Sequence, residues 1–201
     1  MHTRTPPEIT KQLVSLAARV APGQTPLYVP VHPEAGAQVN ECFPNVEAKV
    51  QRDGGAIVHG WQLWEWPNVL IEGEFHAVWR SPGGDLIDIT PKADGEGRIL
   101  FVPDERRTFR GVSIDNVRMA LRNDLLIHHF IKISEHIVKV MNRGDRAQQF
   151  GYVSVPADEI EPLLMFQSLT GEMLRRGLRA HDDCLCGSGK KYKRCHGKLL
   201  A

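Results

Sequence analysis

The C-terminal end of this 201-residue chain gathers three of its four cysteines. Cys184 and Cys186 flank a single residue, and Cys195 directly precedes His196. The Gly-Ser-Gly segment 187–189 separates the two pairs and allows the chain to fold back, because glycine tolerates a positive φ. Three thiols and one imidazole are the ligand set of a closed tetrahedral zinc site, so we expect these four side chains to bind one metal ion. A segment this short has no core of its own, and the bound metal would supply its folding free energy.

Two other states of these cysteines are open at this point. Cys184 and Cys186 could form a disulfide, or all three thiols could be free. Cytosolic thiols are kept reduced, which disfavours the disulfide. The number of ligand types that coincide at this spacing favours the metal site over both alternatives.

The segment from Cys184 to His196 resembles the SEC-C motif, the zinc-binding tail of the bacterial SecA translocase that recurs on other bacterial proteins. The family pattern is Cys-x-Cys, then Gly-Ser-Gly-Lys-Lys-Tyr-Lys, then Cys followed by Cys or His. The chain departs from it at Leu185, where the family usually has proline, and that change affects stiffness rather than ligation. The resemblance implies zinc, or sometimes iron, and a docking role with partners such as the chaperone SecB and the ribosome. It covers only the end of the chain and implies nothing about the rest.

Basic residues surround the predicted metal site. With a formal net charge of +1, the whole chain gives no reason to expect a nucleic acid or a membrane as partner. The local cluster could nonetheless contact RNA or an acidic protein surface. Alternatively, these residues are a solvated shell around a metal centre that three thiolates make anionic. The residues concerned are Lys190, Lys191, Lys193 and Arg194.

A second set of chemically capable residues lies in the first half of the chain. Cys42 falls at the predicted start of a helix, where the partial positive charge of the helix favours a thiolate. His76 falls on a predicted strand and Asp88 on the next one. A thiol nucleophile needs an imidazole to take or hold its proton, and a carboxylate can orient that imidazole. The three residues therefore form a candidate Cys-His-Asp triad.

The strand register brings two members of this triad together. The apolar residues of Val69–Arg80 and Asp85–Thr90 alternate, and both apolar faces must point into one core. A tight turn over residues 82 and 83 then places His76 opposite Asp88 or one diagonal step away. Directly opposed β-carbons lie about 5 Å apart, a workable distance between a base and the group that orients it.

This order of elements, with Cys on a helix and His and Asp on successive strands, resembles the core of the transglutaminase and papain-like fold. The resemblance covers roughly residues 38 to 91 and implies a Cys42 nucleophile, a His76 base and an Asp88 orienter. Papain-like enzymes also use an upstream glutamine as an oxyanion donor, but Gln38 is at a different spacing, and Pro44 departs from the usual helix start. The alternative is that Cys42 is a small buried hydrophobe, that His76 is a surface residue and that Asp88 pairs with any Lys or Arg.

Hydrophobic periodicity and turn residues predict a helix, then strands, then helices, with no repeating βαβ unit. This order favours an α+β fold with an antiparallel sheet and flanking helices, plus a small C-terminal zinc-binding knuckle. We expect an α+β domain over 1–178 and the metal-binding tail over 179–201. The predicted helices are 8–20, 40–50, 117–127, 127–141 and 156–176, where 117–127 and 127–141 are either two helices or one bent helix. The predicted strands are 27–31, 56–66, 69–80, 85–90 and 99–102.

The N-terminus lacks the apolar core of a signal peptide, and no run of apolar residues is long enough to span a bilayer, which predicts a cytoplasmic protein. Two hypotheses about function follow. In the first, the protein is an adaptor that docks through its zinc tail. In the second, it is a cysteine-dependent hydrolase or acyltransferase acting on an amide or thioester, which the tail delivers to its target.

Overall fold

The computed structural model describes residues 3–93, 95–149 and 153–199. It is a mixed fold with 36% helix and 22% strand, and its sheet is antiparallel, which confirms the predicted α+β class. Backbone contacts divide the chain into two compact units. The first unit holds the chain up to Trp66 together with Ile71–Arg110, and the second holds Pro67–Leu70 and the chain from Gly111 onward. The expected boundary between residues 178 and 179 stays a prediction.

The sheet of the first unit has the spatial order β1-β5-β2-β3-β4. Antiparallel pairing joins β1 to β5, β5 to β2, and β3 to β4. Strand β1 lies at one end of this order, as Pro30 predicts, because proline lacks the N–H that a central strand needs. The predicted strand 85–90 is shorter than expected, since only Leu86 and Ile87 pair as β4. The strands are β1 (Leu27–Pro30), β2 (Ala56–Trp66), β3 (Leu70–Arg80), β4 (Leu86–Ile87) and β5 (Arg98–Pro103).

Helix α1 (Lys11–Val20) begins later than the sequence predicts. The sequence offers Thr5 as the cap of the predicted helix 8–20, but Thr10 caps α1, because the Thr10 side chain accepts a hydrogen bond from the backbone N–H of Leu13. The backbone N–H and hydroxyl of Thr5 instead donate to the carboxylate of Glu96. A hydroxyl that satisfies one free N–H of the first turn stabilises a helix, and this contact fixes where α1 starts.

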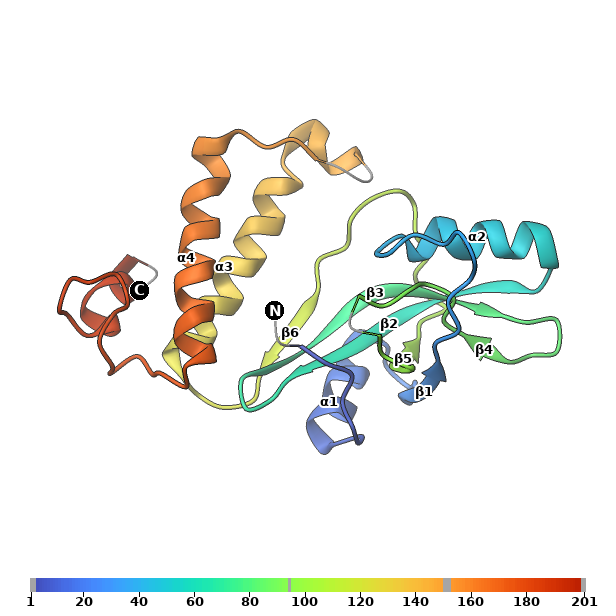
Figure 1. The fold of residues 1–201 in the computed structure, drawn as a ribbon, viewed down its shortest axis with the longest axis horizontal. Coiled ribbons are helices and arrows are strands. Elements are labelled where there is room, and N and C mark those ends of the chain that lie inside the picture. The colour runs from blue at the N-terminus through green and yellow to red at the C-terminus, as the bar shows by residue number, and fades with distance from the viewer. Residues whose placement is uncertain (1–2, 94, 150–152, 200–201) are drawn as a thin grey trace. The chain divides into compact units, whose positions relative to one another are not determined.

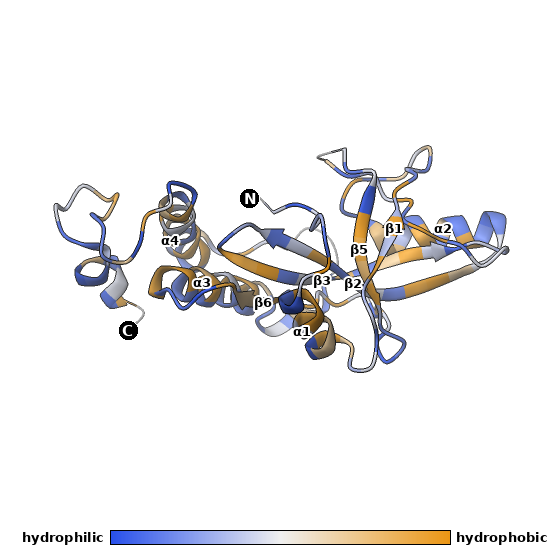
Figure 2. Ribbon diagram, turned by 90° about the horizontal axis from the view of Figure 1, so that it is seen from below, coloured by the Kyte–Doolittle hydropathy of each residue, from blue (hydrophilic) through white to orange (hydrophobic). Residues whose placement is uncertain are grey.

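Helix α2 (Cys42–Asp53) starts at Cys42, which confirms the predicted placement of this thiol in the first helical turn. The helix packs on the sheet through Cys42 and Val46, which are buried against Ala77 and Ile89. Figure 1 shows α2 running along the sheet, and the ribbon of α2 in Figure 2 carries both hydrophilic and hydrophobic residues. This amphipathic pattern anchors the helix by one face and holds its N-terminus at a fixed place.

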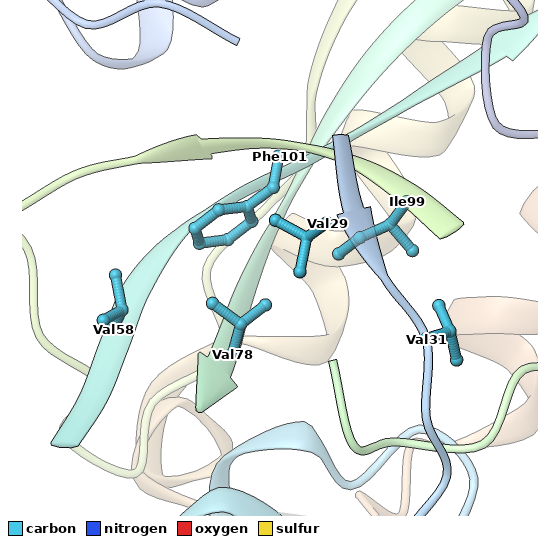
Figure 3. Close-up of a cluster of buried hydrophobic side chains, with 6 residues drawn as sticks. All are labelled: Val29, Val31, Val58, Val78, Ile99 and Phe101. Carbon is cyan, nitrogen blue, oxygen red and sulfur yellow. The ribbon is translucent and has the colours of Figure 1, made fainter. Parts of the chain in front are cut away.

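A separate apolar cluster joins four strands of the sheet (Figure 3). Val29 of β1, Val58 of β2, Val78 of β3 and Phe101 of β5 are all buried in it. Val78 belongs to this cluster while its neighbour Ala77 packs on α2, so both faces of β3 are covered. Burial on both faces makes β3 a rigid support for the polar residues that it carries.

The second unit contains β6 (Val117–Ala120), α3 (Leu125–Met141), the 3-10 helix η1 (Gly144–Gln148) and α4 (Ala157–Arg175). The expected helix over 117–127 is wrong, because β6 is a strand and α3 starts only at Leu125. Asp124 sets that start, since its carboxylate accepts a hydrogen bond from the backbone N–H of Leu126. Two short 3-10 helices, η2 (Tyr192–Arg194) and η3 (His196–Leu199), end the described chain. No described helix combines the length and hydropathy that crossing a bilayer requires.

Candidate metal centre and candidate active site

Backbone hydrogen bonds fold the C-terminal segment back on itself. The backbone N–H of Cys184 donates to the carbonyl of Lys190 over 2.9 Å, and Asp183 and Lys191 form an antiparallel bridge. The turn between them uses Gly187 and Gly189, whose φ values are +78° and +68°. These are left-handed conformations that favour glycine, as the sequence predicts. The turn returns the chain so that its later ligands face the earlier ones.

The donor atoms of Cys184, Cys186, Cys195 and His196 all lie within 4.8 Å of one another. Cys186 Sγ is 3.5 Å from Cys195 Sγ, and His196 Nδ1 is 3.3 Å from Cys184 Sγ and 3.5 Å from Cys195 Sγ. A tetrahedral zinc ion with its usual bond lengths separates two sulfurs by about 3.8 Å and a sulfur from a nitrogen by about 3.5 Å. The observed spacings fit such an ion, and all four cysteines of the chain are free of disulfides.

The thiols of this cluster differ in their surroundings. Hydrogen bonds from the side chain and backbone of Ser188 lower the pKa of Cys186 to about 6. Burial raises the pKa of Cys184 to about 11. A bound cation would replace the proton on each, because metals bind the thiolate form.

The cluster is attached to the helices of the second unit by buried side chains. Tyr192 is fully buried, and its hydroxyl lies 2.9 Å from Nδ1 of His129 on α3. The ring of His196 contacts Phe166 of α4 at a centroid distance of 5.4 Å. His129 is therefore a buried partner of Tyr192 and not a surface histidine. Through these contacts the C-terminal knuckle packs against both α3 and α4.

The basic residues around the cluster are mostly exposed. Lys190, Lys191 and Arg194 face solvent, and Lys193 is half-buried. Lys191 forms an ion pair with Asp183 over 3.0 Å. An exposed pair of this kind contributes little to stability, so these charges remain available to a partner.

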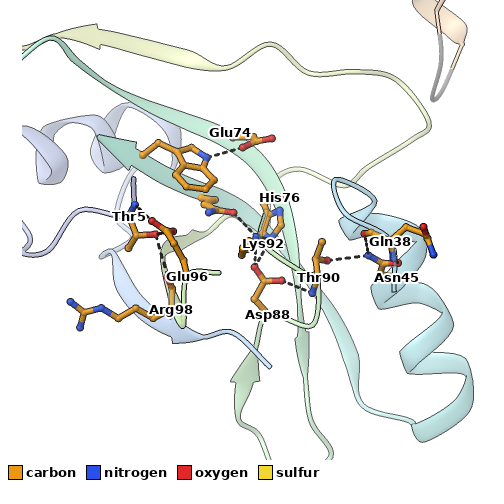
Figure 4. Close-up of polar contacts among 12 residues, drawn as sticks. Thr5, Gln38, Asn45, Glu74, His76, Asp88, Thr90, Lys92, Glu96 and Arg98 are labelled. Atoms are coloured by element: carbon orange, nitrogen blue, oxygen red, sulfur yellow. Dashed lines mark hydrogen bonds and ion pairs between the residues drawn. The ribbon is translucent and has the colours of Figure 1, made fainter. Parts of the chain in front are cut away.

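In the first unit, His76 and Asp88 form a buried pair. His76 Nε2 lies 2.9 Å from Asp88 Oδ2, and the Asp88 side chain is inaccessible to solvent. Asp88 directly follows β4, which pairs Trp79 with Ile87. Continuing this register by one residue puts Asp88 across from Val78, one diagonal step from His76, which is one of the two positions that the sequence allows. Figure 4 shows both side chains turned toward each other.

Cys42 and His76 line one cavity of about 190 Å³. Burial disfavours a charge on His76, but the negative charges of Asp88 and Cys42, with hydrogen bonds to both, raise its pKa to about 9. Burial likewise opposes ionisation of Asp88, and the neighbouring cations His76 and Lys92 outweigh it and lower the pKa of that carboxyl. Because Nε2 of the ring contacts Asp88, Nδ1 is the nitrogen that can exchange a proton with the Cys42 thiol. The structure thus brings the three predicted residues into one constellation.

Two further members of the constellation were not identified from the sequence. Lys92 Nζ lies 2.6 Å from Asp88 Oδ2, the oxygen that His76 also contacts, and its side chain is largely buried. The same ammonium donates to Oε1 of Gln62 over 3.0 Å. Both residues carried a signal, because Gln62 interrupts the apolar strand 56–66 and Lys92 follows Asp88 by four residues.

Gln38, the upstream glutamine, has no place in the cavity wall. Its side chain donates to the carbonyl of Gly36, and its backbone is bonded to Asn45. The rest of the wall is mostly polar, with Asn40, Glu74, Thr90 and Glu96, and it also contains Trp64, Pro91 and Ala93. Trp64 and Glu74 hold each other through a 2.7 Å hydrogen bond.

A scan against protein families matches the SEC-C motif model to residues 182–198. The chain therefore carries a SEC-C motif. This match, together with the convergent cysteines and His196, identifies the C-terminal segment as a metal-binding site. No solved structure matches the chain, so the resemblance of the first unit to the transglutaminase and papain-like fold stays a prediction.

Proposed function

We propose that the first unit is a cysteine-dependent acyl-transfer enzyme, a hydrolase or an acyltransferase acting on an amide or thioester. The observation that carries this proposal is the cavity that Cys42 and His76 share, with His76 held on buried Asp88. A lone buried cysteine explains none of these contacts. A chain that needs only packing at these positions has no reason to bury a histidine, an aspartate and a lysine together, because buried charges cost stability.

The reaction follows from the protonation states. With the pKa of His76 raised to about 9, the imidazolium is present at neutral pH. In the proposed mechanism it pairs with Cys42 in its thiolate form. The thiolate adds to the carbonyl carbon, and the imidazolium gives its proton to the departing amine or thiol as that bond breaks. Water or a second amine then attacks the thioester on Cys42, His76 takes its proton, and the thiolate leaves. Asp88 holds the ring in place through both steps.

Alkylation of Cys42 tests this proposal. A thiolate paired with His76 should react quickly with iodoacetamide at pH 6, where an ordinary thiol is mostly protonated. His76→Ala should slow the reaction at pH 6 by about 10²-fold, and Asp88→Asn should slow it less, because the base remains and only its orientation is lost. The modified peptide is quantified by mass spectrometry on metal-loaded protein, so that the C-terminal thiols stay protected.

Cys42→Ser supplies the control for that experiment, since its remaining label measures the C-terminal thiols alone. If Cys42 of the native protein reacts only after unfolding, the thiol is a structural residue and the enzyme proposal fails.

We also propose that residues 179–201 form a zinc-binding docking module, which makes the protein an adaptor with or without a chemical activity. Convergence of three thiols and one imidazole, with no carboxylate among them, favours zinc, and the same thiols leave iron as a competitor. By resemblance, the ribosome and the chaperone SecB are the candidate partners, and RNA is a candidate for the exposed Lys190, Lys191 and Arg194.

Elemental analysis of protein purified without chelators should find one equivalent of zinc or iron. Co-sedimentation with ribosomes, and binding to purified SecB, should be lost in Cys184→Ser while Cys42→Ser keeps them. A double variant, Lys190→Glu with Arg194→Glu, should weaken binding to ribosomes only if RNA is contacted. Metal-free native protein would refute the site, and metal-loaded protein that binds neither partner would refute these two partners.

A further inference from the structure

Gln62 lies in the middle of β2, and it combines a buried side chain with an amide nitrogen that has no hydrogen-bond partner among the described residues. It is only 1% exposed, and it lines the cavity that Cys42 and His76 also line. Its Nε2 is buried and makes no hydrogen bond within the described part of the chain. Leaving a buried donor unsatisfied costs about 1–3 kcal/mol, so such a group calls for a partner that comes from outside the protein.

The orientation of this amide is fixed by its other end. Lys92 Nζ donates to Oε1 of Gln62 over 3.0 Å, which identifies that atom as the oxygen and the unpaired atom as the nitrogen. Lys92 is in turn held by Asp88 over 2.6 Å. The carboxylate that orients His76 therefore also fixes, through Lys92, the side chain of Gln62 (Figure 4 shows Lys92 beside Asp88). A donor that is held in advance at a reacting centre needs no reorganisation during the reaction.

We propose that Gln62 is a catalytic residue that stabilises the oxyanion of the acyl-transfer step. When the Cys42 thiolate forms its bond to the substrate carbonyl carbon, the carbonyl π electrons move onto oxygen, and Nε2–H of Gln62 donates to that oxyanion. The electrons return as the bond to the amine or thiol breaks, and the proton of His76 goes to the leaving group. This inference rests on the proposed enzyme function and assigns to Gln62 the role that Gln38, bonded away from the cavity, does not fill.

Two reactions of Cys42 separate this role from a structural one. Acylation by p-nitrophenyl acetate passes through a tetrahedral oxyanion, whereas alkylation by iodoacetamide is a direct displacement at a saturated carbon and forms no oxyanion. Gln62→Glu keeps an acceptor for Lys92 but has no donor, and Gln62→Met keeps the volume without adding charge. Both variants should lose about 10²–10³-fold in the rate of the p-nitrophenolate burst. Alkylation at pH 6 should stay within about threefold of the native protein, because it has no oxyanion to stabilise.

The exposed Gln51 of α2 provides the matched control, since Gln51→Glu adds the same charge away from the cavity and should change neither rate. If both Gln62 variants keep the native burst rate, or if burst and alkylation fall in parallel, Gln62 is not an oxyanion donor and the inference is overturned. Native protein with neither a burst nor fast alkylation overturns the proposed enzyme itself. The two failures are thereby distinguishable.

Discussion

The two cysteine–histidine sites of this chain have similar side chains and different chemistry. At the C-terminus, His196 lies among three thiols, and all donor atoms are within 4.8 Å of one another. In the first unit, one thiol, Cys42, shares a cavity with one imidazole, whose Nε2 is bonded to buried Asp88. At the C-terminus, four converging donors without a carboxylate can coordinate a metal cation. In the first unit, an imidazole that a carboxylate orients can exchange a proton with a single thiol. The number of converging thiols, and the contact of the second ring nitrogen, decide which chemistry a Cys–His pair can perform.

The sites also differ in what holds them in place. The metal centre is built within one short segment and is attached to α3 by Tyr192. The cavity is built from a helix start, two strands and the loop after β4, and Asp88 and Lys92 link that loop to His76 of β3 and Gln62 of β2. Substitutions at the first site should act on metal binding and local order, and substitutions at the second should act on the stability of a whole core.

The largest expected effect is the loss of metal on removing one C-terminal thiol. A structural zinc ion contributes roughly 10–16 kcal/mol of binding free energy in small zinc modules. Cys184→Ser should therefore abolish stoichiometric metal and increase hydrogen exchange across residues 182–198. Elemental analysis and exchange mass spectrometry measure these outcomes.

Cys42→Ser is the matched control, since it removes a thiol of similar burial from the other site. It should leave metal content and exchange in the C-terminal segment unchanged. Equal metal loss in both variants would contradict the conclusion that Cys42 takes no part in metal binding.

The next largest effect should come from Asp88. Asp88→Ala leaves His76 and Lys92 buried without their shared anion, and breaking a buried pair in this way costs about 3–5 kcal/mol. Unfolding by urea, followed by tryptophan fluorescence, should show the loss. Asp85→Ala removes an exposed carboxylate that directly precedes β4, and it should change the free energy of unfolding by less than about 0.5 kcal/mol. Equal effects of the two substitutions would contradict a buried electrostatic core.

The pH dependence of stability sharpens the same point. The folded-state pKa of His76, about 9, lies above the ordinary value of 6.5. Its contribution to stability is therefore fully present below pH 6.5 and is lost as the pH rises through 9. The difference in free energy of unfolding between native protein and His76→Gln should shrink from pH 6 to pH 9.5. A difference that stays constant would mean that folding does not raise the pKa of His76.

Much of both sites could be predicted from the sequence, for different reasons. The metal ligands lie within 13 residues of one another, so their spacing alone brings them together. His76 and Asp88 could be paired because strand alternation and a tight turn fix a register to within one step. Cys42 could be placed at the N-terminal end of the predicted helix 40–50, because Pro44 is tolerated only in a first helical turn.

The contacts that long-range packing creates could not be predicted. Gln62 and Lys92 are 30 residues apart and meet only after β2 and the loop beyond β4 assemble. Tyr192 reaches His129 across 63 residues. The strand β6 was mistaken for a helix because a four-residue element is too short to show a reliable period.

Tyr192→Phe tests how the metal centre is attached. The change keeps all four donors and leaves Nδ1 of buried His129 without its hydroxyl partner, which should cost about 1–3 kcal/mol. Metal content should be unchanged, while the urea midpoint falls. Tyr28→Phe is the control, because Tyr28 is only half-buried and water can replace its contact with Pro6. If Tyr192→Phe released the metal, the hydroxyl would belong to the metal site itself.

The smallest expected effect concerns the segment that leads into α2 and so to Cys42. The side chain of Asn45 accepts a hydrogen bond from the backbone N–H of Gln38 and donates to the carbonyl of Gln38 and the hydroxyl of Thr90. It thereby ties the segment before α2 to the segment that follows Asp88. Asn45→Ala should cost about 1 kcal/mol and slow alkylation of Cys42 at pH 6 by about fivefold, because the thiol is then less firmly held beside His76.

Gln38→Ala is the matched control for this segment. Asn45 contacts the backbone atoms of Gln38 and not its side chain, so these hydrogen bonds remain when the side chain is removed. Its alkylation rate should equal that of the native protein. An unchanged rate in Asn45→Ala would mean that the helix and sheet alone position Cys42. A slower rate without loss of metal would show that reactivity at one cysteine site is set by local hydrogen bonds that the other site does not share.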